Sequence, residues 1–485
     1  MCRSVLSLDI LVAGATGFIG RGLVAFLKGK GHRITALVRD VDSARNVLGD
    51  GIALLNWGLS QQQLTEQMEM TDAVINLAGG SIDGRWSSAR KKSFRESRAG
   101  ITQTLSDAIS RSKSPPGLFI SASAVGYYGD TGSKVISEAQ PVGHDYLSTL
   151  CLDWENAATS ARTSKTRVCV LRLGIVVGLD GGILQKLALP LQMGVSPYVG
   201  SGNETLPWIH LIDVLEIIGY CINNPSIEGA VNCTAPSPVT GRQFAEVVAR
   251  ISGAKFKVGI PKFVLWLMFG EGASHLWASH NVLPTKLDRL GYKFRYSNVV
   301  DALNEDLSDE FVTVKTFAQR DLGMSHPKEI RNIVKKGKYM LTAVVEFNGD
   351  PEKVFPFFSS PFNLDLLTPA WVNFQIVEMR DELGRGVSIK YEIGLWFMKF
   401  AWVSEIVSWE PPNSFADNQV RGPYVLWWHE HKIIRTAPGY SKMTDRVIYK
   451  MPGWKFGQLI HKLMIKRTLI NIFNYRRRMI KLMFQ

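Results

Sequence analysis

Three glycines with a regular spacing stand close to the N-terminus. Gly14, Gly17 and Gly20 lie in "VAGATGFIG", directly after the strand-like run "DILVA" and at the start of an amphipathic segment. Glycines at this spacing let the backbone turn tightly and approach a pyrophosphate, which then lies at the N-terminus of the following helix. The pattern predicts a dinucleotide-binding loop; the alternative is a glycine turn that serves packing alone.

The end of the second predicted strand bears on the choice of cofactor. The run "ITALVRD" ends with Arg39 followed by Asp40. An acidic side chain at this place binds the ribose hydroxyls of NAD, whereas an arginine pairs with the additional phosphate of NADP. Because Arg39 comes first, we expect NADP(H) to be favoured over NAD(H). The alternative for Arg39 is a solvated loop charge.

Further motifs carry a family resemblance. The runs "GATGFIG", "NLAGG", "FISASAVGYYG" and "WIHLID" resemble the extended short-chain dehydrogenase/reductases that are similar to sugar-nucleotide epimerases. The runs "GRWSSARKKSFRESR", "CLDWE" and "GEGASHLWASHNVLPTKLDRLGYKFRY" are similar to an atypical "epimerase family protein" branch. The resemblance implies a Rossmann-type fold and NADP(H) binding. The reaction of this branch is poorly defined, and some members are labelled as cell-division inhibitors.

The cofactor-binding residues predicted from the glycine motif and the resemblance are Gly14, Thr16, Gly17, Phe18, Ile19, Gly20, Arg39, Leu77, Ala78 and Gly79.

The resemblance also shows a missing catalytic pair. In the broad family a serine acts with a Tyr-x-x-x-Lys pair, in which the tyrosine exchanges a proton with the substrate. Ser123 matches the serine, but Leu147 stands at the tyrosine position and Cys151 at the lysine position. A substitute acid or base is therefore needed, and we expect Ser123 and Tyr128 to be catalytic. Further candidates, each with a structural alternative, are Tyr127, Cys151, Glu155 and His210.

A basic and aromatic cluster follows the fourth predicted strand. Arg85, Trp86, Arg95 and Arg98 stand in a region that faces the substrate cleft in this fold. Arginines bind carboxylates and phosphates in a bidentate manner. We therefore predict that Arg85, Trp86 and Arg98, with His210 from the other lobe, contact a small-molecule substrate that is anionic or apolar. The alternative is a charged helix face.

The elements that must position these residues follow an alternating pattern. Short apolar runs alternate with amphipathic segments from Asp9 onward, which predicts an α/β fold with a doubly wound parallel sheet. After about Gly178 the pattern loosens into a small substrate lobe. We expect residues 1–310 to form this domain, and the resemblance makes about 255–310 its helical C-terminal extension.

A second domain is predicted after a linker at residues 311–338. Residues 339–485 contain long alternating strands and end in a long amphipathic helix, which indicates an α+β fold. The runs "DPEKVFPFFSSPFNLDLLTP", "WEPPNSFADNQVRGPYVLWWHEH" and "MTDRVIYKMP" resemble the START-like, or helix-grip, superfamily that includes polyketide cyclases. That resemblance implies a cavity for a hydrophobic ligand.

Two histidines of this domain have a spacing that bears on metal binding. His429 and His431 stand at i and i+2 of a predicted strand and so face the same side. They could present two imidazoles to a metal, but no third ligand is visible in the sequence. We predict no metal site and ordinary hydrogen bonding on the sheet face.

Composition limits the other functions. The chain has 485 residues and a formal net charge of +13, without a basic motif interleaved with aromatic residues, so no nucleic-acid partner is expected. No apolar run is long enough to span a membrane, and membrane-surface docking by the basic C-terminal helix is the minor alternative. The five unpaired cysteines and the absence of a signal peptide predict a cytoplasmic protein.

These observations predict an NADP(H)-dependent oxidoreductase or epimerase-like enzyme of unknown substrate, with a fused hydrophobic-ligand-binding domain. The alternatives are a non-catalytic NADP(H)-binding sensor or scaffold and a peripheral lipid-binding protein.

Overall fold

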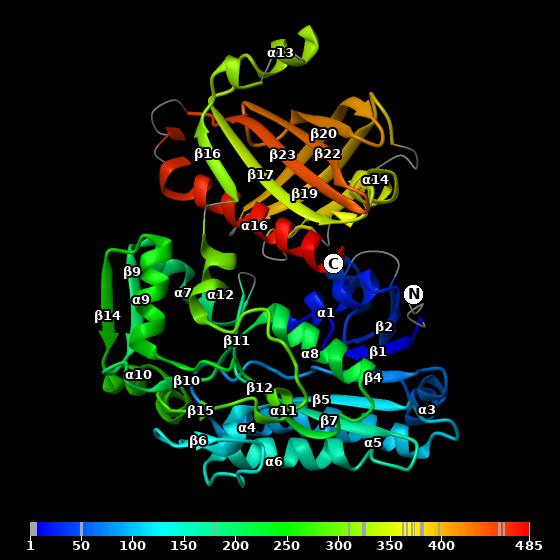
Figure 1. Ribbon diagram of the computed structural model, residues 1–485, viewed down its shortest axis with the longest axis vertical. Helices are drawn as coiled ribbons and strands as arrows, with labels where there is room; N and C mark the ends of the chain where they lie inside the picture. Colours follow the sequence, from blue (N-terminus) through cyan, green and yellow to red (C-terminus); the bar gives the residue numbers. More distant parts are fainter. Residues whose placement is uncertain are drawn as a thin grey trace. The chain divides into compact units, whose positions relative to one another are not determined.

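The computed structural model describes residues 7–48, 52–178, 181–308, 311–322, 326–360, 363–364, 367–369, 372, 374–378, 383–395, 398–453, 457–458 and 461–484. The chain divides into two compact units (Figure 1). The first comprises Met1–Ala44 and Ile52–Ser308, and the second comprises Arg45–Gly51 and Asp309–Gln485.

A seven-stranded parallel sheet forms the centre of the first unit. Its strands, in spatial order, are β12 (Gly229–Cys233), β7 (Arg167–Leu173), β5 (Leu118–Ala124), β4 (Ala73–Asn76), β1 (Asp9–Ala13), β2 (Arg33–Val38) and β3 (Ala53–Asn56). The chain runs outward from β1 through β2 and β3 and returns to the other side of β1 with β4. Ligands bind at such a reversal, beyond the carboxyl ends of the strands. The predicted Rossmann-type doubly wound sheet is confirmed.

Helices cover both faces of this sheet (Figure 1). On one face α1 (Phe18–Gly29) packs against α8 (Leu211–Asn223). On the other face α3 (Gln61–Glu69), α5 (Ile101–Arg111) and α6 (Tyr146–Thr159) share one hydrophobic core with the buried sides of β1, β4 and β5. The remaining helical segments before residue 160 are α2 (Val41–Leu48), α4 (Ser88–Arg95), the π-helical turn η1 (Glu96–Gly100) and the 3₁₀ turn η2 (Val125–Tyr128).

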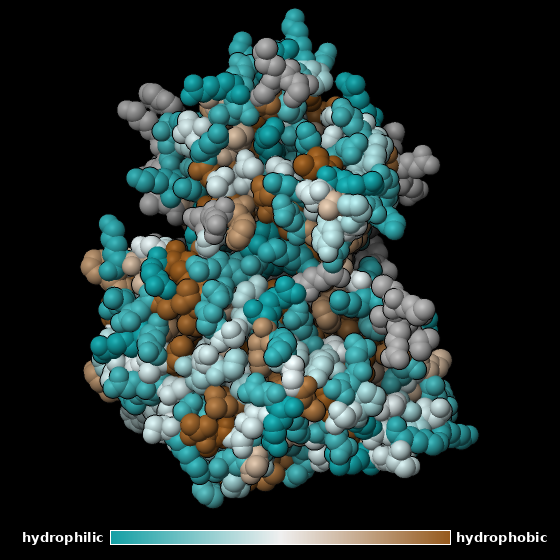
Figure 2. Space-filling view, viewed as in Figure 1, coloured by the Kyte–Doolittle hydropathy of each residue, from teal (hydrophilic) through white to brown (hydrophobic). Residues whose placement is uncertain are grey.

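A smaller lobe follows β7 in the chain. Its core joins α7 (Gly182–Gln192), α9 (Gly241–Ser252) and α12 (Val299–Leu307). Apolar surface is visible over this lobe (Figure 2), where Leu189, Met193, Phe256 and Phe263 are exposed. The other elements are β6 (Val135–Ile136), β8 (Ile175–Val177), β9 (Val195–Val199), β10 (Thr205–Leu206), β11 (Trp208–His210), β13 (Val239–Thr240), β14 (Phe256–Ile260), α10 (Lys262–Phe269), η3 (Gly270–Leu276), β15 (Asn281–Val282) and α11 (Thr285–Arg289).

The second unit is an eight-stranded antiparallel sheet with a long C-terminal helix. The strands, in spatial order, are β16 (Val312–Thr316), β17 (Tyr339–Asn348), β23 (Tyr440–Lys450), β22 (Leu426–Ala437), β21 (Ser414–Arg421), β20 (Met398–Glu410), β19 (Ser388–Leu395) and β18 (Gln375–Glu378). The helical segments are η4 (Gln319–Leu322), α13 (Lys328–Val334), α14 (Pro351–Ser359), the π-helical turn η7 (His461–Ile465) and α16 (Lys466–Met483). Leu469, Ile470 and Phe473 of α16 share a hydrophobic core with the sheet.

The stretch expected to be a linker contains part of this sheet. Val312–Thr316 forms the edge strand β16, which pairs antiparallel with β17. Val312 is buried in the core of the second unit. The alternation within "VTVKT" is too short to predict a strand from periodicity, and pairing with β17 supplies what the local pattern lacks.

Among the residues that the structure describes, no helix is both long enough and apolar enough to cross a membrane.

Candidate cofactor site and its buried polar network

The glycine loop is packed so closely that side chains cannot replace its hydrogens. Gly14 has φ +79°, and a Cβ there would lie 2.6 Å from the carbonyl carbon of Leu77. A Cβ at Gly20 would lie 2.1 Å from the carbonyl oxygen of Gly14. The helix α1 begins after Gly17 without a side-chain cap, so its first N–H groups have no side-chain acceptor from the N-cap. Uncapped N–H groups at a helix N-terminus are suited to a phosphate.

The loop after β4 lies beside the glycine loop. Leu77 N donates to Ala13 O at 2.9 Å, and Ala78 N donates to the side chain of Asn76 at 3.1 Å. Gly79 follows and is exposed. These predicted cofactor residues therefore gather at the carboxyl ends of β1 and β4, the point at which the strand order reverses. Of the others in the glycine loop, Thr16 and Gly17 are exposed, and Phe18 and Ile19 are half-buried.

The two residues after β2 have different surroundings. Asp40 Oδ1 accepts a hydrogen bond from Ser43 N at 3.0 Å and so caps the start of α2. The Arg39 side chain is exposed, and among the described residues its guanidinium has no ion-pair partner. The acidic side chain is therefore engaged with the protein, while Arg39 can meet a phosphate.

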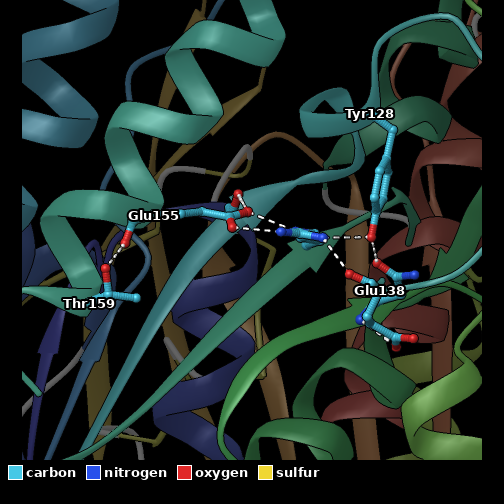
Figure 3. A network of polar contacts seen from close by, with 7 residues as sticks. Tyr128, Glu138, Glu155 and Thr159 are labelled. Carbon is cyan, nitrogen blue, oxygen red and sulfur yellow. Dashed lines mark hydrogen bonds and ion pairs between the residues drawn. The ribbon is translucent and has the colours of Figure 1, made fainter. Parts of the chain in front are cut away.

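A chain of buried polar side chains connects Ser123 to Tyr128 (Figure 3). Ser123 Oγ donates to Glu155 Oε1 at 2.8 Å, and Arg172 Nε and Nη2 bind the two oxygens of Glu155, each at 2.8 Å. Arg172 Nη1 donates to the Tyr128 hydroxyl at 2.8 Å. That hydroxyl donates to Asn232 Oδ1 at 2.7 Å. These five side chains, from β5, α6, β7, η2 and β12, are called the Arg172 network below.

Burial determines the protonation of this network. Tyr128 is only 4% exposed, and burial raises its pKa to about 12 even though the Arg172 cation opposes the shift. Burial disfavours the charge of Arg172, but the adjoining Glu155 carboxylate outweighs it, so the pKa of Arg172 lies above its usual value. At neutral pH Tyr128 therefore keeps its proton, and Arg172 and Glu155 form a buried ion pair.

The two positions of the missing pair lie on α6. Cys151 is buried, and burial together with the Glu155 carboxylate raises the pKa of its thiol to about 12. Leu147 packs against Gly126: a Cβ placed on Gly126 would lie 3.5 Å from the Cβ of Leu147. Neither residue can exchange a proton at neutral pH.

Arg98 lies against the loop after β4. Its Nη2 donates to Gly80 O at 2.8 Å, and its guanidinium carbon lies 3.4 Å from the position of a Cβ on Gly79. The guanidinium is also 5.4 Å from the ring centre of Trp154. The half-buried position of Arg98 disfavours its charge and lowers its pKa. Of the predicted substrate residues, Arg98 is thus beside the predicted cofactor loop.

Arg85 and Trp86 instead connect the segment after β4 to α10 and η3. The Arg85 guanidinium donates to the carbonyl oxygens of Leu267 and Met268 at the end of α10. The Trp86 ring stacks on His275 with ring centres 5.7 Å apart, and its Nε1 donates to Ile82 O at 2.8 Å. Both side chains are held by the protein itself.

His210 is placed away from solvent. It is completely buried at the start of α8, where its Nδ1 accepts from Ile212 N at 3.2 Å. Its Nε2 lies 3.4 Å from Asp306 Oδ2, and its ring centre is 4.3 Å from that of Tyr296. In this arrangement His210 caps a helix and holds α12, and it does not join Arg98 or the Arg172 network.

Sequence reasoning did not single out Arg172, Asn232 or Glu138, whose carbonyl accepts from Arg172 at 3.3 Å. One signal was available. Arg172 is the buried charged residue of the strand "RVCVLRL", which begins with the half-buried Arg167, and a charge inside a buried strand requires a partner.

The second unit encloses a cavity of about 170 Å³ between the sheet and α16. Most of its wall is apolar and aromatic, including Tyr391, Trp402, Tyr424, Trp427 and Phe473. Its polar wall residues include Ser404, Asp417, His429, His431 and Arg476. The cavity is therefore amphipathic.

Comparisons with known proteins match the first unit. The model of the NAD dependent epimerase/dehydratase family matches residues 10–233, and that of a domain of unknown function, DUF1731, matches residues 260–305. The epimerase family protein SDR39U1 homolog from chloroplasts of Arabidopsis thaliana is 35% identical over 302 residues, which are 61% of this chain and 86% of that protein. An epimerase family protein of Mycobacterium bovis is 32% identical over 297 residues, 61% of this chain and 96% of that protein.

Solved structures give the same assignment. The human epimerase family protein SDR39U1, solved with NADPH, has a TM-score of 0.57 and 30% identity, and the match covers 62% of this chain and all of that one. A UDP-glucuronic acid 4-epimerase of Bacillus cereus, solved with UDP-glucuronic acid and NAD, has a TM-score of 0.50 and covers 61% of this chain and 97% of that one. At 18% identity the latter shows the fold alone.

Proposed function

The chain belongs, through its first unit, to the NAD dependent epimerase/dehydratase family, and we propose that this unit is an NADP(H)-dependent oxidoreductase or epimerase-like enzyme acting on a small anionic substrate. The observation that carries the proposal is the meeting of the two loops after β1 and β4 at the switch point of the sheet. The space left there by Gly14 and Gly20 fits a backbone approach to a pyrophosphate.

Individual residues would hold the cofactor as follows. The uncapped start of α1, with Thr16, Gly17, Phe18 and Ile19, would receive the pyrophosphate. Leu77, Ala78 and Gly79 would line the loop on the other side. Arg39 would bind the 2′-phosphate of NADP(H), since Asp40 is occupied as the cap of α2. The human relative solved with NADPH supports this preference.

The bound cofactor would give or accept a hydride, and this chain must position the substrate and provide for the proton. Arg98 lies against the loop after β4, and we assign to it the anionic group of the substrate. Ser123 would hydrogen-bond the reacting oxygen once its hydroxyl hydrogen turns away from Glu155 Oε1, which accepts it in this structure. Glu155 itself is held by two hydrogen bonds from Arg172. Tyr128 anchors the other end of the Arg172 network and keeps its proton.

A second candidate function is favoured by one specific observation. Ser123 is 1% exposed and Tyr128 is 4% exposed, and both hydroxyls already have partners within the protein. A unit that binds NADP(H) with these groups closed to substrate would be a sensor or scaffold rather than an enzyme.

For the second unit we propose a hydrophobic-ligand-binding role of the START-like type. The supporting observations are the antiparallel sheet, the long helix α16 and the aromatic cavity between them. Binding is tested by titrating the full chain with an environment-sensitive apolar dye. Trp402→Ala, which removes a cavity wall, should weaken dye binding, whereas Trp57→Ala in the first unit should not.

The enzyme proposal is tested by hydride transfer. The full chain is incubated with NADPH deuterated at either face of C4 and with a panel of carbonyl compounds and sugar nucleotides. We expect deuterium to pass to a substrate from one face only. Arg98→Leu should raise KM for anionic substrates about tenfold or more, because the variant loses the binding free energy of a charge-assisted hydrogen bond.

A matched pair of serine variants separates catalysis from packing. Ser123→Ala should lower kcat about 10²-fold or more, in the range for an acid–base or positioning group. Ser121→Ala, on the same strand and equally buried, should leave kcat unchanged. Tight NADPH binding without transfer to any member of the panel would favour the sensor.

A further inference from the structure

The second unit brings two histidines and two aspartates onto one face of its sheet. Asp417 on β21 is registered opposite His429 on β22, and His431 is registered opposite Asp445 on β23. Because residues at i and i+2 point to the same side of a strand, His429 and His431 share a face. Asp417 joins the two histidines as a third possible ligand. It lies twelve positions before His429 in the chain but opposite it in the sheet, and the sequence alone did not reveal this.

The ring nitrogens of the two histidines are divided between two carboxylates. His429 Nε2 hydrogen-bonds Asp445 Oδ1 at 3.1 Å, and His431 Nδ1 lies 2.6 Å from the same oxygen. His429 Nδ1 lies 3.9 Å from Asp417 Oδ1. Asp417 is held through its other oxygen, which accepts from Ser404 Oγ at 2.9 Å. Asp445 Oδ1 thus contacts one nitrogen of each ring. The other nitrogens, His429 Nδ1 and His431 Nε2, are left for another partner.

We propose that Asp417, His429 and His431 bind a divalent transition-metal cation at the wall of the cavity. Each offers one ligand atom, and these three atoms lie within 4.8 Å of one another. A cation with bonds of about 2.1 Å would draw them closer by small side-chain rotations. Among the residues that the structure describes, no other three histidine, cysteine or carboxylate side chains meet this condition.

The surroundings agree with such a site. A metal-bound histidine usually donates its second ring nitrogen to a carboxylate, and Asp445 stands at that position for both rings. The Arg476 cation lies beside the site, with Nε 3.7 Å from Asp445 Oδ2, and Asp445 offsets part of its charge. All three ligands line the cavity, whereas Asp445 does not.

The ligand set indicates which cation binds. Two imidazoles and one carboxylate suit Zn²⁺, Fe²⁺ or Co²⁺, whereas Mg²⁺ and Ca²⁺ prefer oxygen ligands. Three protein ligands leave at least one coordination position open. Because the ligands line the cavity, that position would face a ligand that combines an apolar body with an oxygen donor. The proposal does not depend on the reaction of the first unit.

The test uses the metal-stripped full chain and Co²⁺ as a spectroscopic probe. We expect one Co²⁺ per chain, visible absorption bands in the range of nitrogen- and oxygen-bound Co²⁺, displacement by Zn²⁺, and no displacement by a large excess of Mg²⁺. Absence of Co²⁺ binding by the wild-type chain would overturn the proposal without any variant.

Variants then locate the site. His429→Gln, His431→Gln and Asp417→Asn should each weaken Co²⁺ binding by 100-fold or more, and Asp445→Asn by about 10–100-fold through loss of orientation. The matched control is His326→Gln, which removes another imidazole of the same unit. His326 Nε2 lies 2.7 Å from Oε1 of Glu430, the residue between His429 and His431 on β22. It should leave Co²⁺ binding unchanged. Retained binding in both His429→Gln and His431→Gln would overturn the assignment, and far-ultraviolet circular dichroism identifies any variant that fails to fold.

Discussion

At the residue scale, Arg172 determines what the neighbouring side chains can do. Its guanidinium makes two hydrogen bonds to Glu155 and one to Tyr128, and it lies 3.6 Å from the ring centre of Tyr127. Three of the groups that the sequence offers as substitutes for the missing pair, Ser123, Glu155 and Tyr128, are therefore engaged within one network. A buried ion pair costs desolvation, which only close and complete pairing offsets.

Removing one partner of this pair should be far worse than removing both. Arg172→Met leaves the Glu155 carboxylate buried without a counter-ion, and we expect it to lower the free energy of unfolding by about 3–5 kcal/mol. Combining it with Glu155→Gln should restore a large part of that loss. Urea denaturation of the two single variants and the double variant measures the coupling. Additive losses would show that the pair contributes nothing as a unit.

Gly14 and Gly31 provide a matched pair for the glycine loop. Both have positive φ, +79° and +84°, but only Gly14 has backbone atoms in the space of a Cβ; Gly31 has none within 4 Å. Each replacement by alanine should cost about 1 kcal/mol for the left-handed backbone. Gly14→Ala should in addition displace the loop from Leu77 and weaken NADPH binding more than tenfold, whereas Gly31→Ala should leave binding intact. Equal affinities for the two variants would contradict this role of the loop.

At the element scale, Asp213 on α8 holds the segment that precedes α12. Its two carboxylate oxygens accept from Arg295 N at 2.7 Å and Tyr296 N at 3.1 Å. Asp213 is completely buried, and burial raises its pKa to about 6, although the two backbone donors oppose this. The attachment of this segment therefore depends on pH.

The sign of that dependence follows from the raised pKa. The folded state holds the Asp213 proton more tightly than the unfolded state, so the resulting stabilisation is complete below the usual pKa of 3.8 and is lost as the pH rises through about 6. Relative to Asp213→Asn, wild-type stability should fall by up to about 3 kcal/mol between pH 4 and pH 7. Urea denaturation of both proteins across this range measures the difference. A difference independent of pH would contradict the raised pKa.

Elements with local signals could be predicted, and contacts between distant elements could not. The glycine loop was predictable because the turn, the strand before it and the helix after it all lie within Asp9–Gly29. The Arg172 network was not, because Tyr128 and Asn232 are 104 positions apart and meet only when β12 pairs with β7. His210 shows the same limit: its motif placed it near a substrate, but packing against Asp306 and Tyr296 decides its surroundings.

At the scale of the whole molecule, the two units have separate hydrophobic cores. Three clusters of buried hydrophobic residues lie within the first unit, and two lie within the second. A ligand stabilises only the unit that binds it, by an amount set by its concentration relative to Kd. The two proposed sites should therefore respond to different ligands.

Calorimetry of the full chain tests this separation. We expect two unfolding transitions, one for each unit. NADPH should raise the midpoint temperature of the first unit by a few degrees and leave that of the second unchanged. Co²⁺ at a ratio of one per chain should raise the midpoint temperature of the second unit. If NADPH moves both transitions equally, the units unfold together and the independence of their cores is contradicted.

The measurement that bears most directly on the central claim is titration of the purified full chain with NADPH and with NADH, followed by nicotinamide fluorescence. We predict saturable NADPH binding at one site, with NADH weaker. Arg39→Ala should lower NADPH affinity about 10–100-fold and leave NADH affinity unchanged, as expected for the loss of a charged hydrogen bond to phosphate. Absence of binding by either nucleotide would contradict the cofactor site itself, and equal loss of both in Arg39→Ala would contradict the role of Arg39.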